Sequence, residues 1–310
     1  MRILVPGGCG YTGSVLVPKL VEAGHEVTVV DAQWFGHNLT ECRAKVIRQD
    51  IRAGVDCSNQ DAIIHLANIA NDPAGDLNPK LTWEVNALAA AQLADSAVRA
   101  GVRQFIYASS GSVYGVSDEP QVTEETPLMP LTEYNKTKMV AERIFLSYAQ
   151  NMAIQIIRPG TVCGVSPRQR LDITVNGMVA GACNRGTISV VCGEQNRPNI
   201  QIEDLTNLYL WMLERPHLTG IWNAGFENLT GMEIARKVQL YCKDIPIVES
   251  SSPDRRSYRM NSDKLLNAGF QPWRSVDHAI TDLISSYGEG HLREEDKCFN
   301  LKTMRALSIA

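Results

Sequence analysis

The sequence predicts an α/β protein, a doubly wound parallel sheet followed by a smaller C-terminal substrate-binding cap. Apolar strands alternate with helical stretches through the first half of the chain. Several strands are nearly continuous apolar runs, as expected where helices cover both faces of a parallel sheet. After Pro159 the alternation loosens, and Gly, Pro and Arg gather in loops. This change of pattern predicts the cap.

The expected elements follow in chain order. In the first half we expect strands at Arg2–Val5, Glu26–Val30, Lys45–Gln49, Ala62–Leu66, Gln104–Ala108 and Ala153–Ile157, and helices at Thr12–Ala23, Leu81–Ala100 and Tyr134–Gln150. Further on we expect helices at Ile173–Cys183, Ile202–Glu214, Gly231–Cys242 and Val276–Tyr287, and strands near Ile188–Val191, Ile221–Asn223 and Ile245–Val248. The sheet domain is therefore expected over residues 1–160, with segments near 200–214 able to return to it. The cap covers residues 161–287, and the tail 288–310 has no assigned role.

Composition limits the class of protein. The 310 residues are 44% hydrophobic, carry a formal net charge of −4 and contain no Lys/Arg-rich run, which argues against nucleic acid or an anionic membrane as partner. The chain starts with a strand, so we expect no signal peptide, and no apolar stretch reaches membrane-spanning length. Eight scattered cysteines without a C-x-x-C pattern indicate reduced thiols and a cytoplasmic protein. The six histidines form no ligand-spaced cluster, so we expect no metal site.

A glycine-rich loop follows the first strand. Gly7, Gly10 and Gly13 have the spacing G-x-x-G-x-x-G, between an apolar strand and a helix. Such a loop turns sharply, lets a pyrophosphate approach bare backbone and directs a helix N-terminus at it. Asp31 ends the second strand, where a carboxylate accepts hydrogen bonds from ribose hydroxyls and repels a 2′-phosphate. The pattern predicts a Rossmann-type domain that binds NAD rather than NADP.

Two other motifs carry chemistry. Tyr134 and Lys138 are four residues apart, on one face of a helix. An ammonium beside a phenol favours the phenolate and lowers the phenol's pKa from about 10, so Tyr134 is a candidate proton carrier for alcohol–ketone interconversion. Ser110 lies in the Ser/Gly-rich loop after the fifth strand, at the ligand-binding edge of an open sheet. Taken alone, the Tyr134–Lys138 spacing is typical of a pair on a helix surface, and the Ser110 segment is typical of an ordinary loop. Together with the glycine loop, the two motifs predict an active site.

As a set, these motifs resemble a known family. The glycine loop, Asp31, His65-Leu66-Ala67, Ser-Ser-Gly-Ser-Val-Tyr-Gly, Tyr-x-x-x-Lys and Arg158-Pro159-Gly160 occur in the order typical of extended short-chain dehydrogenases/reductases of the NAD-dependent nucleotide-sugar epimerase/dehydratase type. The resemblance spans about residues 1–287.

The resemblance implies a role for each matching residue. Tyr134 would be the general base and acid, Lys138 would bind the nicotinamide ribose, and Ser110 would hydrogen-bond the sugar hydroxyl that is oxidised. The implied cofactor contacts are Gly7, Gly10, Tyr11, Thr12, Gly13, Asp31, Asp50, Ile51, Leu66, Ala67, Asn86, Tyr134 and Lys138, and the implied substrate contacts are Ser110, Ser112, Asn176, Arg197 and Arg256. Asn86 would lie at a helix start, and Arg197 and Arg256 would hold the sugar diphosphate.

Departures from the family pattern bear on the reaction. Dehydratases of the family carry an acidic pair directly after the catalytic hydroxyl residue, whereas this chain has Gly111 and Ser112. We therefore expect an NAD-dependent nucleotide-sugar epimerase, with C4 as the epimerised carbon, acting through a keto-sugar intermediate. The alternatives are an NAD(P)H-dependent reductase of a 4-keto nucleotide sugar, a dehydratase, and a non-catalytic NAD-binding protein. The resemblance also implies a homodimer that pairs through the helices at Leu81–Ala100 and Tyr134–Gln150.

Overall fold

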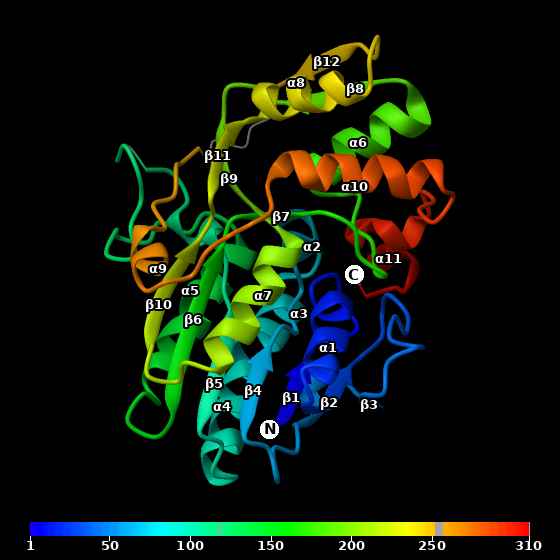
Figure 1. Cartoon of the computed structure of the whole chain (residues 1–310). Helices are drawn as coiled ribbons and strands as arrows, with labels where there is room; N and C mark the ends of the chain where they lie inside the picture. The colour runs from blue at the N-terminus through cyan, green and yellow to red at the C-terminus, as the bar shows by residue number, and fades with distance from the viewer. Residues whose placement is uncertain (118, 252–256, 310) are drawn as a thin grey trace.

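The computed structural model describes residues 1–117, 119–251 and 257–309. Within these ranges the large sheet has seven parallel strands in the order β10-β6-β5-β4-β1-β2-β3 (Figure 1). They are β1 (Arg2–Pro6), β2 (Glu26–Asp31), β3 (Lys45–Arg48), β4 (Ala62–His65), β5 (Gln104–Ala108), β6 (Ala153–Pro159) and β10 (Gly220–Ala224). The strand order reverses between β1 and β4, and the carboxyl ends of strands at such a reversal form a ligand-binding crevice. The α/β fold class and the six strands predicted in the first half are confirmed.

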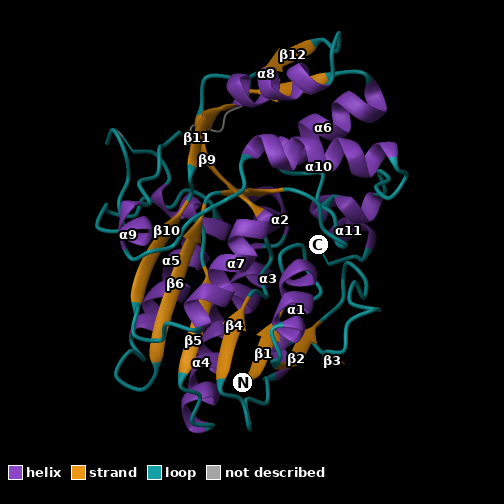
Figure 2. Ribbon diagram, in the orientation of Figure 1, coloured by secondary structure: helices purple, strands orange, loops and turns teal. Residues whose placement is uncertain are grey.

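Helices cover both faces of this sheet, as Figure 2 shows. On one face, α1 (Gly13–Glu22) and α7 (Ile202–Leu213) pack on the side chains of Ile3 and Val5. On the other face, α4 (Ala89–Arg99) and α5 (Glu133–Leu146) pack on Leu4. Alternate residues of β1 thus enter two separate apolar cores, which explains why the strand reads as a continuous apolar run.

The long helix expected at 81–100 is interrupted. The chain forms α3 (Pro79–Trp83), then a π-helical turn over Glu84–Leu88, and then α4. Asn78 caps α3 by accepting the Leu81 N–H at 3.0 Å. Asn86 consequently lies inside the π-helical turn, and the prediction that it stands at a helix start is wrong.

The cap has its own core. The helices α6 (Thr174–Arg185), α8 (Gly231–Tyr241) and α10 (Val276–Gly288) bury apolar side chains against β8 (Ile188–Val191), which pairs with β12 (Ile247–Ser250). A small mixed sheet of β7 (Thr161–Cys163), β9 (Asn196–Gln201) and β11 (Glu227–Thr230) links the cap to the large sheet. The sequence did not predict these three strands, since β9 and β11 are mostly polar and β9 contains Pro198.

A single boundary at residue 160 does not separate the sheet domain from the cap, because the chain crosses between them more than once. The chain enters the cap after β6, returns to the sheet domain with α7 and β10, and enters the cap again at β11. Strand β10 lies beside β6 at the edge of the large sheet. Helix α7 therefore packs in the core of the large sheet, and β10, which ends at Ala224, completes the edge of that sheet.

The tail, which the sequence left unassigned, packs against α2 and the segment before it. After α9 (Asp263–Asn267) and α10, the chain forms α11 (Asn300–Ala306), which lies against α2 (Asp72–Leu77). Asn300 anchors it, because its side-chain amide donates to the Ala70 carbonyl at 3.0 Å and its backbone N–H donates to Asp172 at 3.0 Å. In Figure 1 the C-terminus accordingly lies near α1 and α2.

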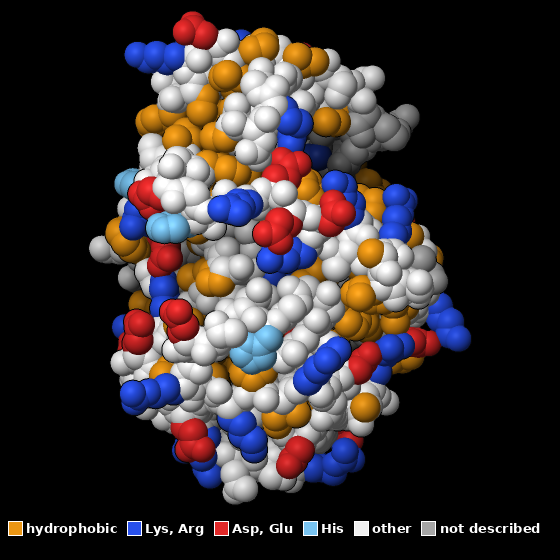
Figure 3. Space-filling view, turned by 90° about the vertical axis from the view of Figure 1, so that its right-hand side faces the viewer, with side chains coloured by type: hydrophobic (Ala, Val, Ile, Leu, Met, Phe, Trp, Pro, Cys, Tyr) orange, Lys and Arg blue, Asp and Glu red, His pale blue; other side chains and the backbone are white. Residues whose placement is uncertain are grey.

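The molecular surface is mixed in charge. On the face shown in Figure 3, acidic and basic side chains are interspersed. Across the part of the chain that the structure describes, no helix combines the length and apolar character needed to cross a bilayer. All eight cysteines are free thiols.

Candidate active site

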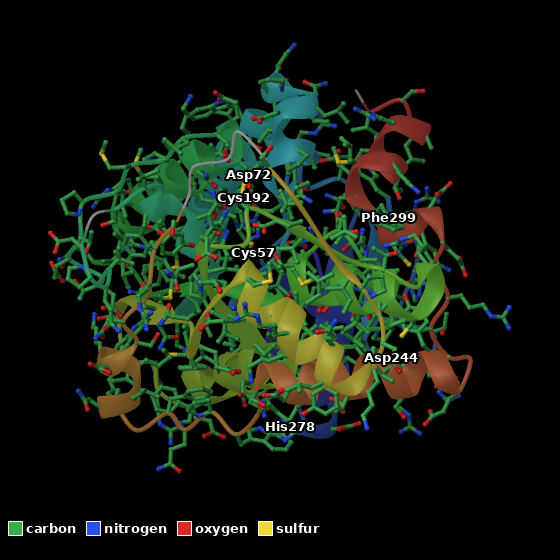
Figure 4. The ribbon with its side chains drawn as sticks, turned by 90° about the horizontal axis from the view of Figure 1, so that it is seen from above. Cys57, Asp72, Cys192, Asp244, His278 and Phe299 are labelled. Atoms are coloured by element: carbon green, nitrogen blue, oxygen red, sulfur yellow. The ribbon has the colours of Figure 1, made fainter. Side chains whose placement is uncertain are left out.

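A cavity of about 780 Å³ lies between the carboxyl ends of the sheet strands and the cap. Its volume is in the upper part of the range for ligand sites. Figure 4 labels three of its lining residues, Asp72 from α2, Cys192 from the loop after β8, and Phe299 from the segment before α11. The sheet domain, the cap and the tail therefore all contribute to its wall.

The glycine loop forms the floor of the cavity at the end of β1. Gly7 has a φ of +85°, and a Cβ at this position would lie 2.4 Å from the Ala67 backbone nitrogen. A side chain at 7 would therefore separate the loop from the turn after β4. Of the predicted cofactor contacts, the cavity is lined by Gly7, Gly10, Tyr11, Thr12, Gly13, Asp31, Asp50, Ile51, Leu66, Ala67, Tyr134 and Lys138.

Asp31 stands at the end of β2 and faces the same loop. One carboxylate oxygen accepts the Cys9 N–H at 3.0 Å and the other accepts the Gln33 N–H at 2.7 Å. Burial raises the pKa of the Asp31 carboxyl, and these two hydrogen bonds oppose the rise. Each oxygen keeps a lone pair, so the carboxylate is able to accept the hydroxyls of a ribose.

Asp50 lies beside the predicted adenine site. Its carboxylate caps a short 3₁₀ turn by accepting the Arg52 N–H at 2.9 Å and pairs with the Arg52 guanidinium at 2.8 Å. Burial raises the pKa of Asp50, but the Arg52 contacts outweigh it and hold the pKa below its ordinary value. The turn thereby presents Ile51 to the cavity.

Tyr134 and Lys138 lie in the first turns of α5, both on the cavity wall. The Lys138 ammonium donates to the Ala108 carbonyl at 2.5 Å, lies 4.8 Å from the centre of the Tyr107 ring and 5.8 Å from that of Tyr134. Burial lowers the pKa of Lys138 to about 7, although the charge of Glu142 opposes this. Thr132 caps the helix by accepting the Asn135 N–H, which fixes the start of α5 and hence both side chains.

Ser110 and Ser112 form a short hydroxyl chain at the end of β5. Their Oγ atoms are 2.7 Å apart, and Ser112 Oγ donates to the Asn135 side-chain oxygen at 2.7 Å. Because the Ser112 hydroxyl hydrogen is used in this bond, the Ser110 hydroxyl is the donor to Ser112 Oγ. A ligand alcohol beside Ser110 is able to donate to the Ser110 oxygen, and a ligand ketone oxygen accepts from Ser110 once its hydroxyl turns from Ser112 to the ligand.

A buried ion pair supports the serine loop from behind. Arg158 and Glu142 are each 1% exposed, and the Arg158 guanidinium donates to both Glu142 oxygens at 2.6 and 2.9 Å. Glu142 also accepts from Ser109 at 2.5 Å, and Arg158 donates to the Tyr114 hydroxyl at 2.8 Å. The network ties α5 and β6 to the loop that carries Ser110. No local sequence pattern indicated that these residues pair with one another.

Two predicted contacts do not lie on the cavity. Asn86 is 1% exposed, and its amide bonds the Ile69 backbone at 2.9 and 3.2 Å and Thr137 at 3.1 Å. Asn176 is fully buried, and its amide accepts from Gly164 N–H and donates to the Tyr11 hydroxyl, both at 3.0 Å. Neither side chain lines the cavity. Both predictions are corrected: these asparagines join loops inside the protein.

Tyr11 has a divided role. It belongs to the cavity wall, but its hydroxyl is buried and donates to the Gly164 carbonyl at 2.8 Å. Burial raises the pKa of this phenol far above its ordinary value. The Tyr11 side chain therefore connects the glycine loop with the cap.

One of the two predicted diphosphate-binding arginines lies on the cavity wall. Arg197 lines the cavity from β9 and donates to the Gln195 side chain at 2.8 Å. Ser110 and Ser112 also line the cavity. Arg256 lies outside the described residues.

Sequence reasoning missed much of the opposite wall. These lining residues include Trp34 and Phe35 after β2, Arg168 and Arg170 before α6, Tyr209 on α7, and Phe299 to Lys302 in the tail. The aromatic pair directly follows Asp31, and the arginines lie in the Gly/Pro/Arg-rich stretch. Their place on the same cavity as the glycine loop depends on long-range packing that local patterns do not reveal.

Comparison with known proteins identifies the family. The sequence model of the NAD dependent epimerase/dehydratase family matches residues 3–225. The chain belongs to this family. It is therefore an enzyme of the epimerase/dehydratase class that uses NAD.

Curated relatives of this family member carry several activities. A UDP-glucose 4-epimerase of Lactobacillus helveticus is 28% identical over 94% of this chain and 97% of its own length. A putative UDP-arabinose 4-epimerase of Arabidopsis thaliana is 28% identical, and the matched region covers 72% of this chain and 63% of that protein, slightly less than two thirds. UDP-glucuronic acid decarboxylase 1 of Xenopus tropicalis is 30% identical over 66% of this chain and 52% of its own.

Solved structures share the fold. TunA, described as an NAD-dependent NDP-hexosamine 5,6-dehydratase, has a TM-score of 0.85 at 23% identity, covering 96% of this chain and 100% of its own. UDP-N-acetylglucosamine 4-epimerase of Methanobrevibacter ruminantium has a TM-score of 0.86 at 19% identity, covering 93% of this chain and 98% of its own. At these identities the likeness establishes the fold alone.

The residues present fit NAD. Gly7, Gly10 and Gly13 line the cavity without side chains, and Asp31 offers carboxylate oxygens on the same wall. Lys138 has three N–H donors, of which the described residues take one. The others are available to ligand hydroxyls.

Proposed function

We propose that this enzyme is a UDP-sugar 4-epimerase. The arrangement that carries the proposal is Ser110, Tyr134 and Lys138 on one cavity wall, followed by a loop that places no acidic group directly after Ser110. Such a site supports reversible oxidation of a hydroxyl and lacks the acid–base pair with which dehydratases of the family remove water. The names of the curated relatives support a UDP-sugar as substrate.

The packing around Gly111 supports the same choice. A Cβ at this position would lie 2.4 Å from the Met260 methyl carbon, and 3.1 Å from both the Pro159 carbonyl oxygen and the Tyr258 hydroxyl. A carboxylate side chain would have to displace this surrounding shell. The Met260 methyl end can shift, but the Pro159 carbonyl oxygen leaves only tight space for a side chain at 111, so glycine suits this position better than an acidic residue.

The proposed mechanism assigns proton transfer to this chain. Bound NAD supplies a hydride acceptor and, once reduced, a hydride donor. Tyr134, as phenolate beside the Lys138 ammonium, accepts the proton of the sugar 4-hydroxyl while Ser110 hydrogen-bonds the same oxygen. The 4-keto sugar turns over in the cavity, and Tyr134 returns the proton after hydride reaches the opposite face. Arg197 holds the diphosphate during this rotation.

The test follows the hydrogen at C4. Purified enzyme is incubated with UDP-glucose carrying deuterium at C4, without added NADH, and the products are identified by NMR. An epimerase yields UDP-galactose that keeps deuterium at C4. In a parallel incubation with a 4-keto UDP-sugar and added NADH, stoichiometric consumption of NADH identifies a reductase, and loss of water from UDP-glucose in the first incubation identifies a dehydratase; either result, without UDP-galactose formation, overturns the proposal. The pentose, hexuronate and N-acetylhexosamine forms of UDP-sugars complete the screen.

We further propose a cytoplasmic homodimer that pairs through α4 and α5. Eight free thiols suit a reducing compartment, and Leu88, just before α4, is 60% exposed on the same side of the sheet. Light scattering after size exclusion measures the mass in solution. A dimer converted to a monomer by Leu88→Glu supports the pairing, and a wild-type monomer contradicts it.

A further inference from the structure

The cap touches the glycine loop through the segment before α6. The Arg168 backbone N–H donates to Ser14 Oγ in the first turn of α1 at 3.3 Å. Ser166 Oγ donates to the Tyr11 carbonyl at 2.7 Å and lies 2.9 Å from Ser14 Oγ. The Arg168 main chain is thereby fixed beside the helix N-terminus at which a dinucleotide pyrophosphate binds.

The Arg168 guanidinium is held on two sides. Its central carbon lies 4.0 Å from the centre of the Phe35 ring, and Nη2 donates to the Asn300 side-chain oxygen at 2.6 Å. Asn300 is itself anchored to Ala70 and Asp172 at 3.0 Å each. The guanidinium therefore has a fixed place in the cavity wall before any ligand binds.

The remaining donors of this guanidinium are unused. Arg168 is 4% exposed and lines the cavity, and its Nε and Nη1 atoms have no hydrogen-bond partner among the described residues. No carboxylate of those residues lies within ion-pairing distance of it. Burial and the charge of Arg170 lower the pKa of Arg168 to about 10, so it is still a cation at neutral pH. A buried, unpaired cation is costly and is stabilised by an anionic ligand.

We propose that Arg168 is a cofactor-binding residue whose Nε–H and Nη1–H donate to the pyrophosphate of NAD, opposite the N-terminus of α1. A planar guanidinium fork matches two phosphate oxygens. A 2′-phosphate on the ribose would meet the Asp31 carboxylate and is disfavoured. The inference rests on the cofactor and not on the sugar reaction, so it stands or fails separately from the 4-epimerase proposal.

The contact connects three parts of the chain through one ligand. The pyrophosphate would bridge α1 of the sheet domain and Arg168 of the cap, while Asn300 of the tail holds the arginine in place. Such a bridge slows cofactor release. Retention of NAD through many turnovers is what an enzyme needs when the same cofactor must be oxidised and reduced in each cycle.

The experiment uses the full chain after removal of co-purified nucleotide. Dissociation constants of adenosine, AMP, ADP, ADP-ribose, NAD and NADP are measured by calorimetry for wild type, Arg168→Met, Arg168→Lys and Lys297→Met. Lys297 does not line the cavity, is 61% exposed and pairs with Glu295 at 2.8 Å, so it controls for loss of one charge.

The proposal predicts that Arg168→Met loses affinity only for ligands that contain a pyrophosphate. Arg168→Met weakens ADP, ADP-ribose and NAD by about 10- to 100-fold, as for charge-assisted hydrogen bonds, and Arg168→Lys weakens them less. Adenosine binding by Arg168→Met, and NAD binding by Lys297→Met, change by less than about threefold. Without ligand, Arg168→Met melts at the wild-type temperature or above it, because an unpaired buried charge has been removed.

Three outcomes would overturn the proposal. An equal loss for adenosine would mean that Arg168 stacks on the adenine. A loss confined to NADP would place it at the ribose 2′-position. Unchanged NAD affinity together with a lower melting temperature of the ligand-free variant would make Arg168 a structural residue only.

Discussion

The two walls of the cavity are built differently. On the sheet side, Asp31 and Lys138 lie at the ends of regular elements and are held by backbone groups, the Cys9 N–H and the Ala108 carbonyl. On the cap side, Arg168 comes from a loop and is held by another side chain, Asn300. A hydrogen bond to a backbone group persists when most residues at the partner position are substituted, whereas a hydrogen bond to a side chain is lost when that partner residue changes. The sheet wall is therefore suited to chemistry that stays constant, and the cap wall to recognition that varies.

The largest effect is expected on the sheet wall. Tyr134→Phe removes the proton carrier and should lower kcat by about 10³-fold, within the range for general acid–base groups, with NAD affinity nearly unchanged. Turnover and NAD binding are measured side by side. Tyr241→Phe, on the outer surface of α8, is the matched control and keeps wild-type turnover. A Tyr134→Phe enzyme within tenfold of wild type would move the chemistry away from this wall.

The support behind the sheet wall comes next. Glu142→Ala leaves the Arg158 cation buried without its partner and should cost about 3–5 kcal/mol of unfolding free energy. Glu214→Ala removes an exposed partner of Arg215, with Glu214 74% exposed, and should cost less than about 1 kcal/mol. Urea unfolding of both variants gives the comparison. Equal costs would show that the buried pair does not stabilise the serine loop.

Two glycines with the same backbone conformation separate strain from close packing. Gly7 and Gly24 have φ values of +85° and +81°, but a Cβ at Gly24 meets nothing within 4 Å. Gly24→Ala should cost about 1–2 kcal/mol from backbone strain alone. Gly7→Ala should cost roughly 1–3 kcal/mol more from the clash with Ala67, and should weaken NAD binding. The idea fails if the two alanine variants unfold at the same denaturant concentration.

On the cap wall, Arg197→Met should act on the substrate alone. We expect KM for the UDP-sugar to rise by about tenfold or more, since a charge-assisted contact is lost, with kcat and NAD affinity changed little. Steady-state kinetics and NAD titration measure the three quantities. A fall in kcat with unchanged KM would instead place Arg197 with the catalytic group.

The last prediction concerns pH. The pKa of Lys138 is lowered from 10.5 to about 7, so the unfolded chain binds more protons between these values. This lysine therefore destabilises the ligand-free fold fully below pH 7, and the penalty disappears as the pH rises toward 10.5. Lys138→Met should raise the melting temperature at pH 6 and leave it unchanged near pH 10.5, while activity is lost. A variant less stable than wild type at pH 6 would contradict the assigned burial penalty.

Local spacing was sufficient for the sheet wall. Gly7, Asp31 and Tyr134 stand in patterns where neighbouring residues dictate a turn, a strand end and a helix face, and all of them line the cavity. Asn86 and Asn176 have residue types that suit a ligand equally well, but burial directs their amides to backbone groups inside the protein. Residue type does not distinguish an internal hydrogen-bond hub from a ligand contact.

The cap wall could not be predicted in the same way. Arg168 meets Ser14 across more than 150 residues of sequence, and Asn300 reaches Ala70 across 230. Strands β9 and β11 pair with each other and not with the large sheet, so polar side chains suffice there. These contacts depend on how two units pack, and no short window of sequence carries that information.

The position of β10 has a consequence for synthesis on the ribosome. This edge strand pairs with β6, with Ile221 opposite Ile156, yet strands β7 and β9 of the small sheet and helix α6 of the cap are encoded between them. As the nascent chain emerges, one edge of β6 stays unpaired until 65 further residues, up to the end of β10, have been added. Pairing across such a separation is slow, and an open strand edge invites pairing with other chains. Chaperone protection during synthesis matters most in this interval.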